Sequence, residues 1–143
     1  MKRYLIVFLS LILLQTITLT AQTEFSEANV KSVLIKLLEF SNNKDYAKAN
    51  PIIAYRGEDI ERDMKDNFNL DDKAEFNKLK RICNQIYALL KISEYEIGEF
   101  SKTTIEENTF YIYEVEFKSN KQSILKEFVF IPRNERLLLV EMK

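Results

Sequence analysis

Histidine is absent from this sequence of 143 residues, and the chain has one cysteine and two glycines. Without histidine, Ser-His-Asp and Cys-His catalysis and His-ligated zinc are excluded, and the usual general base near neutral pH is missing. One cysteine cannot build a thiolate metal cage. Two glycines, Gly57 and Gly98, provide neither a P-loop nor a dinucleotide fingerprint. The sequence therefore predicts no metal centre and no cofactor.

The N-terminal segment has the features of a secretory signal peptide. Lys2 and Arg3 form a short positive region, and the run from Tyr4 to Leu14 is almost wholly apolar. This run is shorter than the ~20 residues that a membrane-spanning helix needs. Polar residues follow it before Ala21, after which we expect cleavage. The sequence thus predicts a signal peptide over residues 1–21 and an exported protein, periplasmic or secreted. An uncleaved signal anchor is the alternative.

The expected mature chain, residues 22–143, is long enough for a single α+β domain with its own core. Removing 21 residues from 143 leaves 122, and losing Lys2 and Arg3 leaves 19 basic against 22 acidic residues, a net charge of −3. This balance favours neither nucleic-acid binding nor, after signal cleavage, attraction to a membrane. Cys83 has no partner for an internal disulfide. It also lies far from the cleavage site, which excludes a lipoprotein anchored at its first mature residue.

Apolar spacing and capping residues predict helices in the first half of the mature chain. A helix is expected over Ser26–Ser41, where Ser26 can accept a hydrogen bond from an orphan amide, and a short one over Asp45–Ala49, before Pro51. Residues 52–55 are expected to be a short strand or an extended link. Helices are expected again over Glu58–Phe68 and over Asp72–Lys91, where Asp72 and Glu75 have the spacing of a capping box.

The second half alternates in the manner of strands. Four strands separated by short turn sequences predict an antiparallel meander, and Gly98 marks a candidate bulge in the first strand. In the second strand, Phe110 and Ile112 are apolar, and so are the residues that alternate with them, Tyr111 and Tyr113. This predicts that the start of the second strand is covered on both faces. Apolar residues expected to share faces are Tyr95 and Ile97; Tyr111, Tyr113, Val115 and Phe117; Phe128 and Phe130; and Leu138, Val140 and Met142.

This order of elements resembles the nuclear-transport-factor-2-like, or cystatin-like, architecture. The resemblance covers most of the mature chain at the level of topology. It implies that the helices pack into a strongly curved four-stranded antiparallel sheet. More narrowly, the stretch YRGEDIER followed by ICNQI is similar to small exported bacterial proteins of unknown function. That likeness implies no activity, so it transfers no functional residues.

The stretch YRGEDIERDMKDNFN contains the best site candidates. If it lines the mouth of the sheet's concavity, Tyr55, Arg56, Asp59 and Arg62 could bind a ligand, and the planar guanidinium of Arg56 could take a carboxylate or a phosphate. The simpler interpretation is a turn followed by a solvated, salt-bridged helix face. Asp59 and Arg62 are spaced i to i+3, and Arg62 and Asp66 i to i+4, and such pairs contribute only ~0.2–0.5 kcal/mol each.

Two tyrosines in the aromatic cluster complete the candidate ligand-binding set. Tyr111 or Tyr113 could offer a hydroxyl as a polar handle in a pocket, although such clusters are more often core. Cys83 lies on an apolar helix seam, so we expect a buried thiol; a redox-reactive thiol is the alternative. No pair of acidic residues has the pattern of a glycosidase site.

The leading hypothesis is a non-enzymatic exported domain that binds a small molecule or a protein partner through its curved sheet. A second hypothesis is a structural protein that forms a homodimer through an open sheet face near Phe110 and Ile112. A third is an enzyme that relies on carboxylates, Tyr, Lys or Arg, and it rests only on the abundance of acidic residues.

Overall fold

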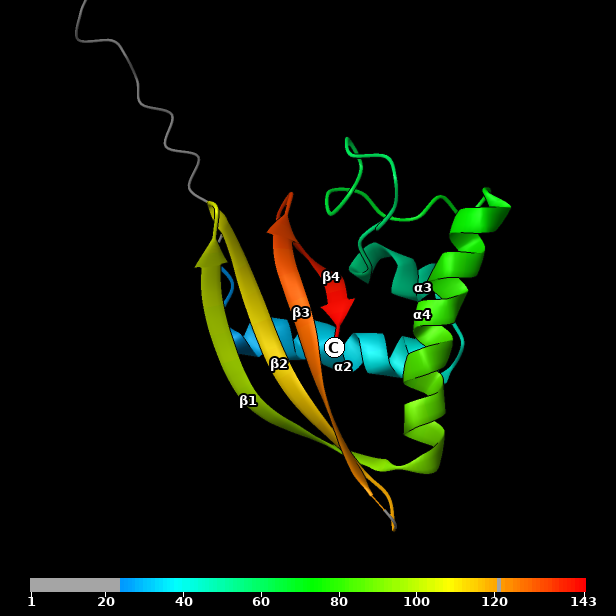
Figure 1. Ribbon diagram of the computed structural model, residues 1–143, viewed down its shortest axis with the longest axis vertical. Coiled ribbons are helices and arrows are strands. Elements are labelled where there is room, and N and C mark those ends of the chain that lie inside the picture. The colour runs from blue at the N-terminus through cyan, green and yellow to red at the C-terminus, as the bar shows by residue number, and fades with distance from the viewer. Residues whose placement is uncertain (1–23, 121) are drawn as a thin grey trace, which may run out of the picture.

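The computed structural model describes residues 24–120 and 122–143, and the expected signal peptide over residues 1–21 lies outside them. The described residues form an α+β fold in which helices pack against one face of a four-stranded antiparallel sheet (Figure 1). Helices come first along the chain and strands second, which confirms the predicted α+β class with a four-stranded antiparallel sheet. None of the described helices is long and apolar enough to pass through a membrane.

Helix α2 runs from Glu27 to Asn42, within one residue of its expected bounds. The hydroxyl of Ser26 accepts a hydrogen bond from the backbone N–H of Asn29 at 3.2 Å. The Asn29 side chain accepts one from the Ser26 backbone N–H in return, so two orphan amides are satisfied. The helix crosses the hollow of the curved sheet (Figure 1). The apolar stripe that it buries there contains Val30, Leu34, Leu37 and Leu38.

A short helical segment follows, as expected. Helix α3 spans Tyr46–Ala49 and continues into the 3-10 turn η1, Asn50–Ile52, which contains Pro51. Ile53 then leaves the turn with extended backbone and pairs in parallel with Leu139 of the last strand. The extended segment predicted from residue 52 therefore begins at residue 53, where it covers part of a sheet edge.

The prediction of a helix over Glu58–Phe68 is wrong, because these residues form a loop of turns. The carbonyl of Asp59 accepts hydrogen bonds from the N–H groups of Arg62 and Asp63, which is the start of a helical turn. The φ angle of Met64 is 58°, which interrupts the helical backbone there, although the Arg62 carbonyl still accepts hydrogen bonds from the N–H groups of Lys65 and Asp66. The Met64 N–H donates to the Tyr55 carbonyl at 3.0 Å, and the Tyr55 N–H donates to the Asp66 carbonyl at 2.7 Å. The bond from Met64 to Tyr55 thus takes the place of the one that the Met64 N–H would donate to the Ile60 carbonyl in a helix.

Helix α4, Lys73–Ile92, matches its prediction closely. The carboxylate of Asp72 caps it by accepting a hydrogen bond from the Glu75 N–H at 2.8 Å. The helix buries Leu79, Cys83 and Ile86 against the rest of the core. The expectation that the Cys83 thiol is buried is confirmed.

The sheet is the expected meander, in the order β1-β2-β3-β4. In strand β1, Ile97 pairs with Val115 and Phe100 pairs with Tyr113, so two residues of β1 lie opposite one of β2. This is the bulge predicted at Gly98. Two-residue turns with positive φ angles close the first and last hairpins, at residues 106–107 and 134–135. The strands are β1, Glu94–Ile105; β2, Asn108–Lys118; β3, Ser123–Arg133; and β4, Arg136–Met142.

Apolar side chains cover both faces of the sheet, as the sequence predicts near Phe110 and Ile112. The inner face packs on α2 and α4 and forms the main core. On the outer face, Phe110 and Ile112 pack against a second buried cluster that Met64 of the loop also contacts. That cluster consists of Ala54, Val129, Ile131, Leu138 and Val140. The loop therefore belongs to the outer layer of the fold.

Candidate functional site

Arg62 is the centre of the segment Tyr55–Asn69, which we call the 55–69 loop. Its guanidinium donates to both carboxylate oxygens of Glu75 on α4, at 2.7 and 3.0 Å, and to the carbonyl of Asn67 at 3.2 Å. It also lies over the ring of Tyr55, 4.3 Å from the centroid. A bidentate pair of this kind fixes both partners in space. Arg62 therefore ties the loop to the first turn of α4.

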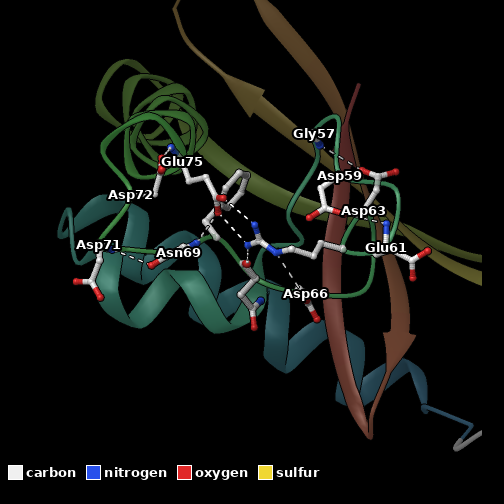
Figure 2. A network of polar contacts seen from close by, with 12 residues as sticks. Gly57, Asp59, Glu61, Asp63, Asp66, Asn69, Asp71, Asp72 and Glu75 are labelled. Atoms are coloured by element: carbon white, nitrogen blue, oxygen red, sulfur yellow. Dashed lines mark hydrogen bonds and ion pairs between the residues drawn. The ribbon is translucent and has the colours of Figure 1, made fainter.

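The carboxylate of Glu75 connects a second part of the loop, as Figure 2 shows. Besides Arg62, it accepts a hydrogen bond from the backbone N–H of Asn69 at 2.6 Å. The hydrogen bonds from Arg62, and then that from Asn69, hold the pKa of Glu75 below its ordinary value. Arg62 also has Asp66 at 3.6 Å, which is the predicted i to i+4 pair. The guanidinium of Arg62 is thus engaged by groups of the protein itself, and its main partner, Glu75, lies 13 residues away in the sequence.

Arg56 has two partners in the fold. Its Nε donates to the Asp63 carboxylate at 3.1 Å, and a terminal nitrogen donates to the carbonyl of Val140 at the edge of β4, also at 3.1 Å. The neighbouring Gly57 is required by a close approach, because a Cβ there would lie 2.3 Å from the Tyr55 hydroxyl oxygen. The Arg-Gly pair is therefore explained by packing against Tyr55 and β4.

Asp59 organises the tip of the 55–69 loop. Its carboxylate accepts a hydrogen bond from the backbone N–H of Glu61 at 3.1 Å, and Figure 2 shows Asp59, Glu61 and Asp63 together around this turn. The pattern is an Asx turn, in which a short side chain satisfies the backbone two residues on. Of the loop candidates, Tyr55, Arg56 and Arg62 join one network with β4 and α4, whereas Asp59 makes the turn that presents Arg62.

Tyr111 and Tyr113 lie at another part of the molecule, beneath the start of α2. The Tyr111 hydroxyl accepts a hydrogen bond from the Phe25 N–H at 3.1 Å, and the Tyr113 hydroxyl donates to the Glu27 carbonyl at 3.3 Å. Both side chains are buried. Burial, together with the nearby Glu27 carboxylate, raises the pKa of Tyr113 to about 12. The six candidates therefore form two groups, and the hydroxyls of this second group hold the N-terminus of α2 on the sheet.

The concave face of the sheet is filled by the protein's own side chains. Tyr111, Tyr113, Phe117, Phe128 and Phe130 all have at most 2% of their surface exposed. Leu34 and Leu37 of α2 are fully buried in the same cluster. A ligand in the hollow of the sheet would have to displace this core, so the binding surface must be sought elsewhere.

An open groove lies where α2, the end of α4 and the start of β1 meet. Its volume is about 490 Å³. Ile35 and Tyr95 line it and remain 42% and 43% exposed. The groove is lined by both apolar and polar side chains, as binding sites usually are. Leu38 and Leu90 complete the apolar part, and Glu39, Asn42 and Ser93 form the polar part.

Comparisons with protein-family models, with curated proteins and with solved structures find no match for this chain. The structure alone therefore has to supply the argument for function. Within the described residues, no three His, Cys, Asp or Glu side chains gather as a metal ion would require.

Sequence reasoning did not identify the groove or the partner of Arg62. The capping-box spacing predicts that the Glu75 side chain bonds back to the start of its helix, whereas in the structure it bonds to Arg62 and to the Asn69 backbone. Ile35 has a signal in the sequence, because it is a large apolar residue outside the apolar stripe of its helix. An apolar residue on the solvent side of an amphipathic helix marks a contact surface when others lie beside it.

Proposed function

We propose that this chain is an exported, non-enzymatic domain, built on a nuclear-transport-factor-2-like or cystatin-like plan, that binds a protein partner. The partner would place an apolar side chain in the groove between α2, α4 and β1. The observation that carries the proposal is this groove, in which Ile35 and Tyr95 are exposed although the sheet's own hollow is filled. The way α2 lies in the curved sheet supports the architectural part (Figure 1).

The shape of the groove favours a protein segment over an enclosed small molecule. Small-molecule sites bury about 70–90% of a drug-sized ligand. Here, two of the lining side chains are more than two-fifths exposed, so the groove is open along one side. An apolar side chain projecting from a partner's surface fits such a groove, while the rest of that partner covers the rim.

The carboxyl groups give the enzyme alternative no support. A carboxylic acid that acts as a general acid or base near neutral pH has a raised pKa. Where the described carboxyl groups depart from their ordinary pKa, the direction is downward, and the leading cause is a hydrogen bond from a Lys, an Arg or, for Glu116, the Ser123 hydroxyl. These groups are Glu24, Asp45, Glu75 and Glu116.

A displayed peptide library tests the proposal. Peptides selected on the purified chain should share one or two apolar anchor positions, and Ile35→Ser should weaken their binding about ten- to a hundredfold, because it removes most of an apolar contact. Ile60→Ser is the matched control, since Ile60 is 82% exposed on the 55–69 loop. Selection of no peptides, or of peptides that bind the Ile35 and control variants equally, would contradict the proposal.

A further inference from the structure

The two edges of the sheet differ in how they are covered. At the β4 edge, the Ala54 N–H donates to the Leu139 carbonyl at 2.9 Å, and Arg56 donates to the Val140 carbonyl at 3.1 Å. At the other edge, β1 has β2 as its neighbour and no further strand among the described residues. We propose that a second copy of this chain pairs with the β1 edge, so that two four-stranded sheets join around a two-fold axis at Phe100.

The turn that closes the β1–β2 hairpin shows which amides face this free edge. Ile105 pairs with Asn108 across a two-residue turn, and both turn residues have positive φ angles, 47° and 67°. In such a hairpin the flanking pair exchanges both backbone hydrogen bonds. Pairs of this kind alternate along an antiparallel ladder with pairs whose N–H and C=O groups point away. The backbone groups of Thr104, Lys102 and Phe100 therefore point outward.

The same alternation of inward- and outward-pointing backbone groups continues beyond the bulge, in the first half of β1. Two residues of β1, Gly98 and Glu99, together lie opposite one residue of β2, so the alternation resumes with Ile97. Ile97 and Tyr95 then direct their backbone groups to the free edge. Five outward-facing residues result, and they are symmetric about the central one: Tyr95, Ile97, Phe100, Lys102 and Thr104.

A two-fold axis at Phe100 matches this edge to itself. Phe100 lies opposite Phe100 of the second copy, Ile97 opposite its Lys102, and Tyr95 opposite its Thr104. Every outward amide and carbonyl then faces one of the opposite kind, which provides about ten hydrogen bonds between the copies. The pair of Tyr95 with Thr104 joins an aromatic and a β-branched side chain, a combination that stabilises antiparallel strands.

The charges on β1 agree with this register. On the outer face, Glu96 lies opposite Thr103 of the second copy, and Glu94 lies opposite Ile105, so no two like charges face each other. An axis at Lys102 would set two lysines directly opposite one another. Tyr95 and Ile105, which are 43% and 57% exposed, would both gain a neighbour at the pairing ends. The observed bulge and charge pattern therefore favour one register over its alternative.

This pairing goes beyond the proposed partner groove and does not depend on it. Backbone hydrogen bonds along β1 carry the pairing, whereas the groove is formed by side chains of α2 and α4 as well. The two meet at Tyr95, where Thr104 of the second copy would extend the rim of the groove. Failure of one proposal would leave the other standing, because Ile35 has no role in the strand pairing.

Sedimentation velocity of the full chain, across a wide concentration range, tests the pairing. The wild-type chain should form a dimer. The double variant Tyr95→Glu/Thr104→Glu sets carboxylates opposite each other on both sides of the axis, so its dimer dissociation constant should rise about ten- to a hundredfold. The double variant Tyr95→Lys/Thr104→Glu sets opposite charges there and should restore pairing. Because both variants lack Tyr95, the comparison isolates the cross-strand contact from any loss of packing.

Circular dichroism should show that both double variants are folded, since Tyr95 and Thr104 are exposed. A wild-type chain that remains monomeric at the highest concentration would overturn the proposal. So would a dimer whose dissociation constant is the same in the two double variants, because it would form through another surface.

Discussion

Asn67 links the 55–69 loop to two other segments, and replacing it by alanine should destabilise the fold. Its side-chain amide nitrogen donates to the carbonyls of Asn50 and Ile53, both at 2.9 Å. Its side-chain oxygen accepts a hydrogen bond from Arg136 at 3.1 Å. Asn67→Ala removes all three bonds at a half-buried position.

The expected loss of unfolding free energy is about 2–3 kcal/mol. Each of the two amide bonds contributes roughly 1 kcal/mol net. The carbonyls left behind add to the loss, because a partly buried acceptor without a donor retains some of its desolvation cost. The bond to Arg136 is at the surface and adds little.

Urea denaturation measures this effect, with the variant's m-value checked against that of the wild type. Asn69→Ala is the control two residues away, because its side chain accepts one exposed hydrogen bond, from the Asp71 N–H. That control should change the unfolding free energy by about 0.5 kcal/mol or less. If Asn67→Ala also stayed within about 0.5 kcal/mol of wild type, the anchoring role assigned to Asn67 would be wrong.

Three further predictions concern the last hairpin, the loop clamp and the thiol. Glu135→Gly should stabilise the fold by about 0.5–1 kcal/mol, because position 135 has a φ of 61° and the change creates an Asn-Gly turn after Asn134; thermal unfolding checks it. Arg62 depresses the pKa of Glu75 in the folded state. The difference in unfolding free energy between wild type and Glu75→Gln should therefore have its full value at pH 7 and shrink as the pH falls below about 4.5, because the carboxylate is then protonated. Urea denaturation at each pH measures this difference. Burial raises the pKa of the Cys83 thiol, so a thiol reagent should label it slowly in buffer and fully in denaturant, and rapid native labelling would contradict its placement in the core.

Periodic patterns predicted the regular elements well. Helices α2 and α4 each have a long apolar stripe with a capping residue in front, and both begin within one residue of where the caps placed them. The strands followed from alternation, and Gly98 marked the bulge. These signals succeed because each one depends on residues close together in the sequence, where the geometry of a helix or strand fixes which side chains share a face.

The same local reasoning failed over residues 58–68. Charged residues there have helical spacing, and Arg62 and Asp66 do form their i to i+4 pair. Such a pair contributes only tenths of a kcal/mol. The contacts that shape this segment depend on residues outside it. They are two backbone hydrogen bonds with Tyr55, the bidentate pair with Glu75 and the contact of Met64 with the outer cluster. Their positions follow from the folded chain and cannot be read from spacing.

The charges of this loop and the contact of Met64 with the outer face of the sheet have a common explanation. The outer face of β3 and β4 carries Val129, Ile131, Leu138 and Val140, all at most 8% exposed, and the helices lie on the other face. Other residues must therefore cover these side chains, and Met64 of the 55–69 loop does so together with Ala54, the residue before the loop. The loop buries Tyr55 and Phe68 near its two ends in the main core, and the side chains between them stay exposed or half-buried. This accounts for the dense charges around Met64. Three side chains of the loop then hold it in place: Arg56 bonds to β4, Arg62 to α4 and Asn67 to η1. The charged residues that most resembled a ligand site in the sequence therefore hold the 55–69 loop against the outer face of the sheet.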